Sequence, residues 1–220
     1  MKKGQTTSHY DEDYFAWQSS LGEFGAWANR TKFSDYVSPQ NDVLDFGCGG
    51  GFLLEKLNCR RKVGVEINPA AAETARGHGI EVHESVSELP DACVDLIISD
   101  NALEHTPRPL DVLEELYSKL RIGGKIVLVV PCESISYRYR PNDINQHLYS
   151  WSPMCLGNLL TRAGFSLVES KPYIHKWPPL YRVLAKLGGR RGFELVCRIY
   201  GRLARGWFQV RAVAEKKGDG

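Results

Sequence analysis

A short apolar run at residues 43–46 leads directly into a turn that is rich in glycine. The glycines are Gly47, Gly49, Gly50 and Gly51. Glycine allows positive φ angles and lets the backbone approach a ligand, because no Cβ stands in the way. Asp45 precedes the turn, and Glu66 follows it at the end of the next β-branched run. Because an ionised carboxylate can accept hydrogen bonds from both hydroxyls of a ribose, we expect a nucleoside site here.

The details of the turn favour a nucleoside that carries positive charge. A dinucleotide site has the pattern GxGxxG, whose helix N-terminus faces pyrophosphate, and its third glycine falls on Phe52 here. Asp45 would repel a pyrophosphate, but it could hold a cationic amino-acid group. A nucleotide-sugar or NAD-dependent enzyme of related topology is the alternative.

The elements that position these residues alternate regularly along the chain. Apolar runs predict strands at residues 43–46, 63–67, 80–83, 95–99 and 125–130, and helical spacing separates most of them. Pro69 is expected to begin one helix, and Gly123 and Gly124 to end another at residues 109–120. Three of the strands are continuously apolar, which is typical of strands covered on both faces. The pattern predicts an α/β fold with a parallel sheet between two layers of helices.

With these elements in place, the chain resembles the class I S-adenosylmethionine (SAM) dependent methyltransferases. Asp45, Gly47, Gly49 and Gly51 match the D/E-x-G-x-G-x-G turn, and Glu66 matches the acid that closes the second strand. Residues 95–131 are similar to the fourth strand, helix and fifth strand of small-molecule methyltransferases, including those of quinone biosynthesis. Residues 145–165 resemble the segment that follows in many members.

The resemblance implies a Rossmann-like, doubly wound sheet of seven strands, with an antiparallel last strand at residues 207–214. It also implies SAM as the cofactor. The implied cofactor-binding residues are Asp45, Gly47, Cys48 and Gly49 around the amino-acid end, Glu66 at the ribose, Ile67 against the adenine and Asn101 closing over the cofactor. The loop after the third strand usually supplies an aspartate to the adenine. Ser85 stands at that position here, so Ser85, Glu84 or backbone amides are the candidates for this contact.

The implied reaction is methyl transfer to a small or lipid-linked acceptor, at oxygen, with a saccharide or a quinone-like precursor as the acceptor class. A hydroxyl acceptor calls for a general base, and His105 and His147 follow the fourth and fifth strands, where the crevice is expected. Alternatively, His105 is a cap or packing residue and His147 lies in a surface loop. A non-catalytic SAM-binding subunit also remains open, because SAM binding requires only the turn.

Charge and motifs argue against a nucleic-acid substrate. Residues 1–170 hold 16 basic and 23 acidic side chains, whereas residues 171–220 hold 12 basic and 3 acidic ones. The main body therefore has no basic stripe. Residues 100–103 (DNAL) also lack the (D/N)PPY tetrapeptide that amino methyltransferases of adenine or glutamine use.

The ends of the chain are expected to add helices to the core. The aromatic-rich residues 1–40 predict an N-terminal helical cap on a methyltransferase domain at residues 41–220. Within that domain, residues 177–206 predict an insertion of two basic amphipathic helices, resuming after Gly188 and Gly189. Their apolar faces would cover the sheet or the substrate cavity. Peripheral contact with a membrane surface and a homodimer interface are the other two interpretations.

Cysteine spacing and hydropathy bear on the compartment. None of the six cysteines forms a CxxC pair or has a histidine at zinc-ligand spacing, so no metal site is predicted. No apolar run approaches the roughly 20 residues of a membrane span, and no signal peptide is recognisable. We therefore expect a cytoplasmic protein with reduced thiols.

Overall fold

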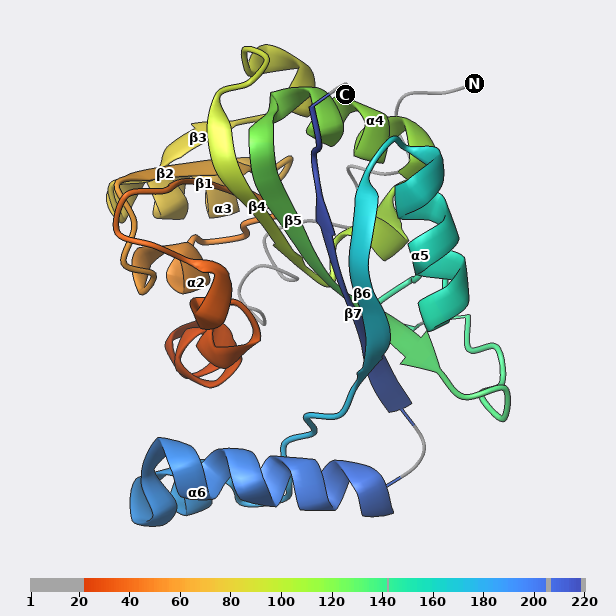
Figure 1. Ribbon diagram of the computed structural model, residues 1–220. Coiled ribbons are helices and arrows are strands. Elements are labelled where there is room, and N and C mark those ends of the chain that lie inside the picture. Colours follow the sequence, from red (N-terminus) through yellow and green to blue (C-terminus); the bar gives the residue numbers. More distant parts are fainter. Residues whose placement is uncertain (1–21, 142, 205–206, 219–220) are drawn as a thin grey trace.

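The computed structural model describes residues 22–141, 143–204 and 207–218, and its centre is a seven-stranded sheet (Figure 1). The strands are β1 (Asp42–Phe46), β2 (Arg61–Val65), β3 (Glu81–His83), β4 (Val94–Asp100), β5 (Leu120–Glu133), β6 (Ser166–Tyr173) and β7 (Trp207–Glu215). Their order is β3-β2-β1-β4-β5-β7-β6. The five strands from β3 to β5 are parallel, and β7 runs antiparallel between β5 and β6. This arrangement confirms the predicted fold.

Helices cover both faces of the sheet, as its apolar strands require. One face carries α2 (Phe52–Glu55), α3 (Pro69–Gly77) and the short helices η1 (Arg30–Lys32) and η2 (Ser34–Tyr36), preceded by a helical segment at 22–29. The other face carries η3 (Val86–Glu88), α4 (Pro109–Lys119) and α5 (Pro153–Arg162). Successive residues of β1 point to opposite faces, so Val43 enters one core and Leu44 the other. Of the predicted N-terminal cap, residues 1–21 lie outside the described part of the chain.

Local capping sets the helix boundaries. Pro69 occupies the first turn of α3, and the Asn68 side chain accepts hydrogen bonds from two backbone amides of that turn. Ser152 and Pro153 begin α5 in the same way, since the Ser152 hydroxyl accepts from the Cys155 amide. The start of α3 agrees with the sequence-based expectation for Pro69, and the start of α5 is of the same kind.

The expected end of α4 is confirmed to within one residue, but the role expected of Gly123 and Gly124 is wrong. The helix ends at Lys119, and Gly123 and Gly124 belong to β5. Between Val94 and Leu96 of β4 the pairing jumps from Leu120 to Lys125, which leaves a bulge on β5 that contains both glycines. Gly123 has a φ of +79°, a conformation that glycine adopts without strain.

The basic insertion forms α6 (Tyr181–Leu203), which lies at one end of the sheet (Figure 1). It is one element with a non-helical residue at Gly189, so the two predicted helices are joined across a kink. The residues that it buries are Phe193, Cys197 and Gly201. The leucines expected to cover the sheet point to solvent instead, with exposed fractions of 81% for Leu187 and 77% for Leu203. Among the described residues, no helix combines the length and apolarity needed to cross a membrane.

Candidate functional site

The glycine turn between β1 and α2 has no space for a side chain at Gly47 or Gly51. Gly47, Gly49 and Gly51 all have positive φ angles. A Cβ on Gly47 would lie 2.4 Å from the Cβ of Ala102, in the segment after β4. The turn is also held to β2, because the amides of Gly47 and Cys48 both donate to the Val65 carbonyl. The backbone is therefore fixed close to the carboxyl ends of β1, β2 and β4.

Cys48 presents its backbone at the turn and directs its side chain into the core. A Cβ on Gly64 would lie 2.5 Å from the Cys48 Sγ, so the glycine in β2 makes room for the thiol. Burial raises the pKa of this thiol, which keeps it neutral.

Glu66 faces the turn and stabilises it. Its two carboxylate oxygens accept hydrogen bonds from the backbone amides of Gly49 and Asn68, each at 2.8 Å. Burial raises the pKa of Glu66, and these amide donors oppose the increase. A carboxylate at the end of β2 is thus held beside the glycine turn, as the sequence predicts.

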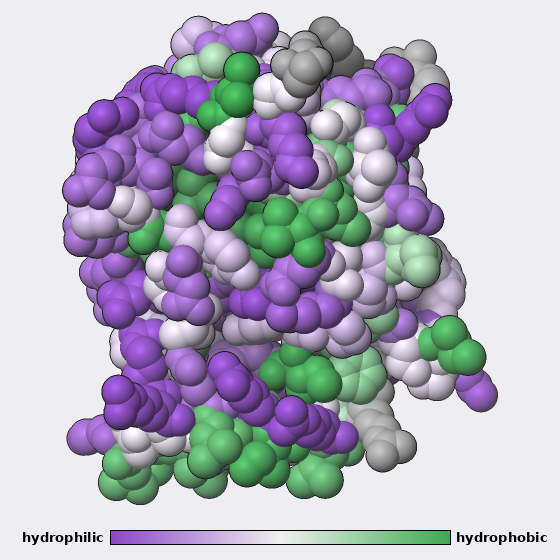
Figure 2. Space-filling model, in the orientation of Figure 1, coloured by the Kyte–Doolittle hydropathy of each residue, from purple (hydrophilic) through white to green (hydrophobic). Residues whose placement is uncertain are grey.

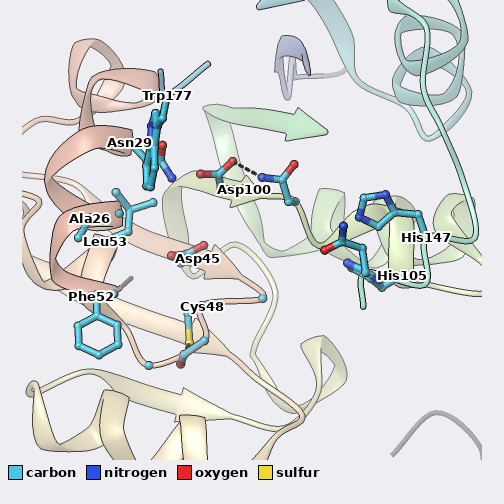
Figure 3. Close-up of a pocket in the computed structure, with 17 residues that line it drawn as sticks. Ala26, Asn29, Asp45, Cys48, Phe52, Leu53, Asp100, His105, His147 and Trp177 are labelled. Carbon is cyan, nitrogen blue, oxygen red and sulfur yellow. Dashed lines mark hydrogen bonds between the residues drawn. The ribbon is translucent and has the colours of Figure 1, made fainter. Parts of the chain in front are cut away.

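Two cavities lie on either side of this turn. The first, of about 380 Å³, is lined by residues that include Asp45, Asp100, His147 and Trp177 (Figure 3). The second, of about 280 Å³, is lined by residues that include Glu66, Ile67, Asn68 and Pro107. In the described part of the chain, the residues that line both cavities are Gly47, Asn101 and His105.

Asp45 is a buried acid that lines the first cavity. Burial raises its pKa to about 8, and the neighbouring charges of Asp100 and Glu66 act in the same direction. Asp100 is itself paired with buried Lys32, whose Nζ lies 2.8 Å from its Oδ1. Among the described residues, no cation forms a salt bridge with Asp45, so this carboxyl group could pair with a positively charged ligand.

Asn101 lies between the two cavities in a left-handed conformation, with a φ of +58°. Its backbone amide donates to the Val129 carbonyl, its Nδ2 donates to Asp100, and its Oδ1 accepts from Gln209. These bonds compensate for a backbone conformation that is unfavourable for a non-glycine residue. The position agrees with a residue that closes over a ligand bound across both cavities.

The two candidate histidines come together at the edge of the first cavity (Figure 3). Their ring centroids are 5.0 Å apart, although His105 belongs to η4 (Leu103–His105) and His147 to the loop after β5. The Nδ1 of His147 lies 2.7 Å from the Glu133 carboxylate. Each histidine also places its Nε2 3.9 Å from Oε1 of Glu104, a fully buried side chain.

The adenine candidates differ in their placement. Ile67 is half exposed and lines the second cavity. Ser85 precedes η3, where its hydroxyl accepts from the Ser87 amide, and it lines neither cavity. Its hydroxyl is thus used in capping, and its contact with adenine stays a prediction.

Sequence reasoning missed several residues of the site. Asp100 is the last residue of β4 and Glu104 follows that strand, both within five residues of His105, so their position at the end of a strand was the available signal. Trp177 and Asn29 enter the first cavity from segments far apart in the chain (Figure 3). Phe24 packs against both Trp177 and Trp27, an aromatic contact that the sequence could not locate.

A model of the methyltransferase domain family matches residues 14–170, well over half of the chain. The chain belongs to the SAM-dependent methyltransferases. This membership favours SAM over the dinucleotide and nucleotide-sugar alternatives.

Individual relatives agree with this family. A probable SAM-dependent methyltransferase of Mycolicibacterium smegmatis is 27% identical over 70% of this chain and 62% of its own length. The ribosomal protein L11 methyltransferase of Burkholderia lata is 38% identical, but the match covers 42% of this chain and only 32% of that enzyme. The methyltransferase solved in complex with the Trm112 activator of Haloferax volcanii has the same fold, with a TM-score of 0.71, 16% identity and coverage of 99% and 100%.

The site fits SAM chemically. The buried Asp45 carboxyl can pair with the cationic amino-acid portion, and the side-chain-free turn admits close approach of a ligand. The remaining acceptor capacity of Glu66 can receive ribose hydroxyls. SAM supplies a methyl group on a sulfonium, an electrophile that is already activated. A protein that uses this electrophile has to align an acceptor with it and exclude water.

Proposed function

We propose that this protein transfers the methyl group of SAM to an oxygen of a small or lipid-linked acceptor. The observation that supports this most directly is the junction of the two cavities at Gly47, Asn101 and His105. The second cavity suits a nucleoside, since Glu66 and Ile67 line it. The first cavity then has Asp45 for the amino-acid portion and a separate edge, formed by the two histidines, for an acceptor.

The histidines are the candidates for taking the proton of an acceptor hydroxyl. Because a carboxylate only accepts hydrogen bonds, Glu133 favours the His147 tautomer that is protonated at Nδ1. The Nε2 of His147 then carries the lone pair that a general base needs. His105 lines both cavities and is the other candidate.

The loop after β5 supports a polar acceptor. A third cavity, of about 670 Å³, shares Asn145 and His147 with the first. Its other lining residues are mostly polar or aromatic, and they include Tyr137, Arg138, Tyr139 and Arg140. Hydroxyl-rich molecules such as saccharides, or quinone-like rings, match such a lining, since arginine donates hydrogen bonds and tyrosine offers a flat apolar surface.

The exposed face of α6 supports a lipid-linked acceptor. Figure 2 shows hydrophobic residues along the outer edge of this helix, next to a band of hydrophilic ones. The exposed apolar residues on and beside it are Leu180, Val183, Leu187, Leu195, Ile199 and Leu203. The exposed basic residues are Arg182, Lys186, Arg191, Arg198 and Arg202. A helix of this composition can lie in the interface of an anionic membrane, where each basic residue adds about 1 kcal/mol.

The helix α6 lies close to the cavity that is proposed to hold the acceptor. Trp177 lines the first cavity, and its ring packs on Tyr181 in the first turn of α6 at a centroid distance of 5.1 Å. A membrane-bound acceptor could therefore reach the histidines while the helix rests on the lipid. We place the protein in the cytoplasm, at a membrane surface.

The reaction is tested by incubating the protein with tritiated SAM and cell extract, then separating lipid, small-molecule and protein fractions. We expect label in the lipid or small-molecule fraction. We also expect at least a hundredfold loss of turnover in His105→Ala or His147→Ala, with SAM binding retained. His83→Ala is the matched control, because the His83 side chain lines neither cavity. Label only in protein would contradict the acceptor class, no label at all would favour a non-catalytic SAM-binding subunit, and near-wild-type turnover in both variants would exclude a histidine base.

The membrane contact is tested by co-sedimentation, at low salt, with vesicles that contain roughly 30% phosphatidylserine. We expect the protein to bind these vesicles, and the binding to weaken as the salt concentration rises. Each of the variants Leu187→Glu and Leu195→Glu should abolish the binding. Glu73→Gln, an exposed change on α3, should bind as the wild type does. Absence of binding, combined with a dimeric mass in solution that the same leucine variants reduce to a monomer, would instead favour the homodimer interpretation.

A further inference from the structure

Three potential metal ligands converge at the edge of the first cavity. Glu104, His105 and His147 each offer one donor atom, and these atoms all lie within 4.8 Å of one another. Donor atoms bound to one cation at about 2.0–2.2 Å lie roughly 3–3.5 Å apart, so small side-chain movements would complete such a site. Figure 3 shows both histidines on the side of the cavity opposite Trp177.

The backbone holds the three residues together. Glu104 and His105 are neighbours in η4, directly after β4. The amide of Leu148 donates to the Glu104 carbonyl at 3.0 Å, which ties the loop that carries His147 to the same turn. The cluster therefore joins the carboxyl ends of β4 and β5, two neighbouring strands.

The Glu104 carboxyl group is the independent sign of a ligand. Its side chain is fully buried, and neither oxygen has a hydrogen-bond partner among the described residues. A buried carboxyl group without a partner is costly, and buried charges in proteins are usually paired or bound to metal. The Nε2 atoms of the two histidines each lie 3.9 Å from Oε1 of this carboxyl group.

Glu133 contacts the second ring nitrogen of His147. It lies 2.7 Å from Nδ1 of His147, the ring nitrogen that does not face Glu104. Ligating histidines usually have such a carboxylate or carbonyl on their second nitrogen, which fixes the ring and makes it a better ligand. Glu133 is thus a positioning residue for His147.

We propose that Glu104, His105 and His147 bind one divalent first-row transition-metal ion, such as Zn²⁺, Co²⁺ or Mn²⁺. Two imidazole nitrogens with one carboxylate suit these ions, whereas Mg²⁺ and Ca²⁺ prefer oxygen ligands throughout. Three protein ligands leave coordination positions for oxygen atoms of an acceptor. Cation binding itself does not depend on the proposed function.

The consequence for the reaction does rest on the proposed function. An acceptor hydroxyl next to such an ion loses its proton more readily, so the proton can pass to solvent without a histidine base. The acceptor oxygen then forms its bond to the methyl carbon as the sulfur–carbon bond breaks. Acceptors with phenolic or adjacent hydroxyls would be preferred, because they can bind the ion directly.

The proposal is tested with Co²⁺ added to chelator-treated, full-length protein, and followed by visible absorption and calorimetry. We expect one ion per chain, a hundredfold or greater loss of affinity in Glu104→Gln and His147→Gln, and a 10–100-fold loss in Glu133→Gln. His83→Gln is the control, since His83 lies on the surface beside Glu81 and Glu88 and could bind ions adventitiously. Unchanged SAM affinity and a cooperative thermal transition in each variant show that the chain is folded.

Absence of stoichiometric Co²⁺ binding by the wild type would overturn the proposal, as would equal binding by the wild type and Glu104→Gln. Full methyl transfer by chelated protein would overturn the catalytic part and leave the histidine base as the explanation. Specific Co²⁺ binding without methyl transfer to any fraction would support the metal site and contradict the proposed function instead.

Discussion

At the scale of single residues, Asp45 links the charge of the ligand to pH. Burial and the acids Asp100 and Glu66 hold its pKa at about 8 in the ligand-free protein. The buried cation Lys32 forms its salt bridge with Asp100 and not with Asp45. A cationic ligand favours the ionised form, so binding below pH 8 has to expel a proton. SAM affinity should rise by up to about tenfold per pH unit between pH 6 and 8. At higher pH it should fall again, because the amino group of the ligand, whose pKa is about 7.7–8.0, loses its charge. Calorimetry across this range measures it.

Asp45→Asn is the matched variant for that measurement. It keeps the shape of the side chain and removes the titration, so its affinity should be weaker and no longer rise between pH 6 and 8. A wild-type affinity that is flat over this range would contradict the pairing of Asp45 with a cationic group.

Asp45 should also lower the stability of the ligand-free protein at neutral pH. The pKa of Asp45 is about 3.8 in the unfolded chain and about 8 in the folded chain. At a pH between these two values, Asp45 of the folded chain holds a proton that the unfolded chain has released. Stability attributable to Asp45 therefore falls as pH rises through this window. Asp45→Asn should raise the thermal midpoint at pH 8, by roughly 2–4 °C per kcal/mol gained, and leave it little changed at pH 4. A lower midpoint for the variant at pH 8 would refute this explanation.

Single residues also show what sequence can and cannot predict about the site. Asp45 and Glu66 follow from residue type and spacing, because the ends of adjacent parallel strands must meet at one edge. The pairing of Lys32 with Asp100 joins residues that are distant in the chain, and no local pattern encodes it. Glu104 could not be predicted as a site residue, because what distinguishes it is its burial, and burial is a property of the folded chain.

At the scale of elements, the start of β1 depends on one buried acid. Asp42 accepts hydrogen bonds from Arg60 and Arg121, and the Arg60 bond is the largest cause that lowers the Asp42 pKa, to about 2. The stability that it contributes is present above pH 4 and is lost as pH falls toward 2. Asp42→Asn should destabilise the protein by roughly 1–3 kcal/mol at pH 7, and by less as pH falls through that window.

Urea denaturation at several pH values measures this effect. Glu73→Gln, which alters an exposed acid on α3, should leave the curves unchanged. An Asp42→Asn deficit that is the same at pH 7 and pH 2.5 would mean that packing, and not charge, holds this corner of the sheet.

Elements also differ in how far sequence determines them. The starts of α3 and α5 could be predicted because Pro69, Asn68 and Ser152 act on their own helix turns. The role of Gly123 and Gly124 could not, since both glycines belong to a bulge whose partner strand is distant in the chain. The buried face of α6 was missed for a related reason. Gly201 permits close packing against Ile174, and small residues carry no hydrophobic signal.

At the scale of the whole molecule, the sheet was predictable and its surroundings were not. Strands that are apolar on both sides require two helical layers, and that requirement fixes most of the topology. The contact between the N-terminal segment and α6 depends on aromatic packing among Phe24, Trp27 and Phe193, which join distant parts of the chain. This contact brings Asn29 and Trp177 to the same cavity.

The central claim is that the turn at residues 47–51, with Asp45 and Glu66, binds SAM. Calorimetric titration of the purified protein with SAM, its demethylated product and NAD tests it most directly. We expect one site that binds SAM and its product, with affinity lost about 10–150-fold in Glu66→Gln, as expected for hydrogen bonds to a charged group, and unaffected in Glu73→Gln. No heat with SAM at millimolar concentration, or tighter binding of NAD, would contradict it.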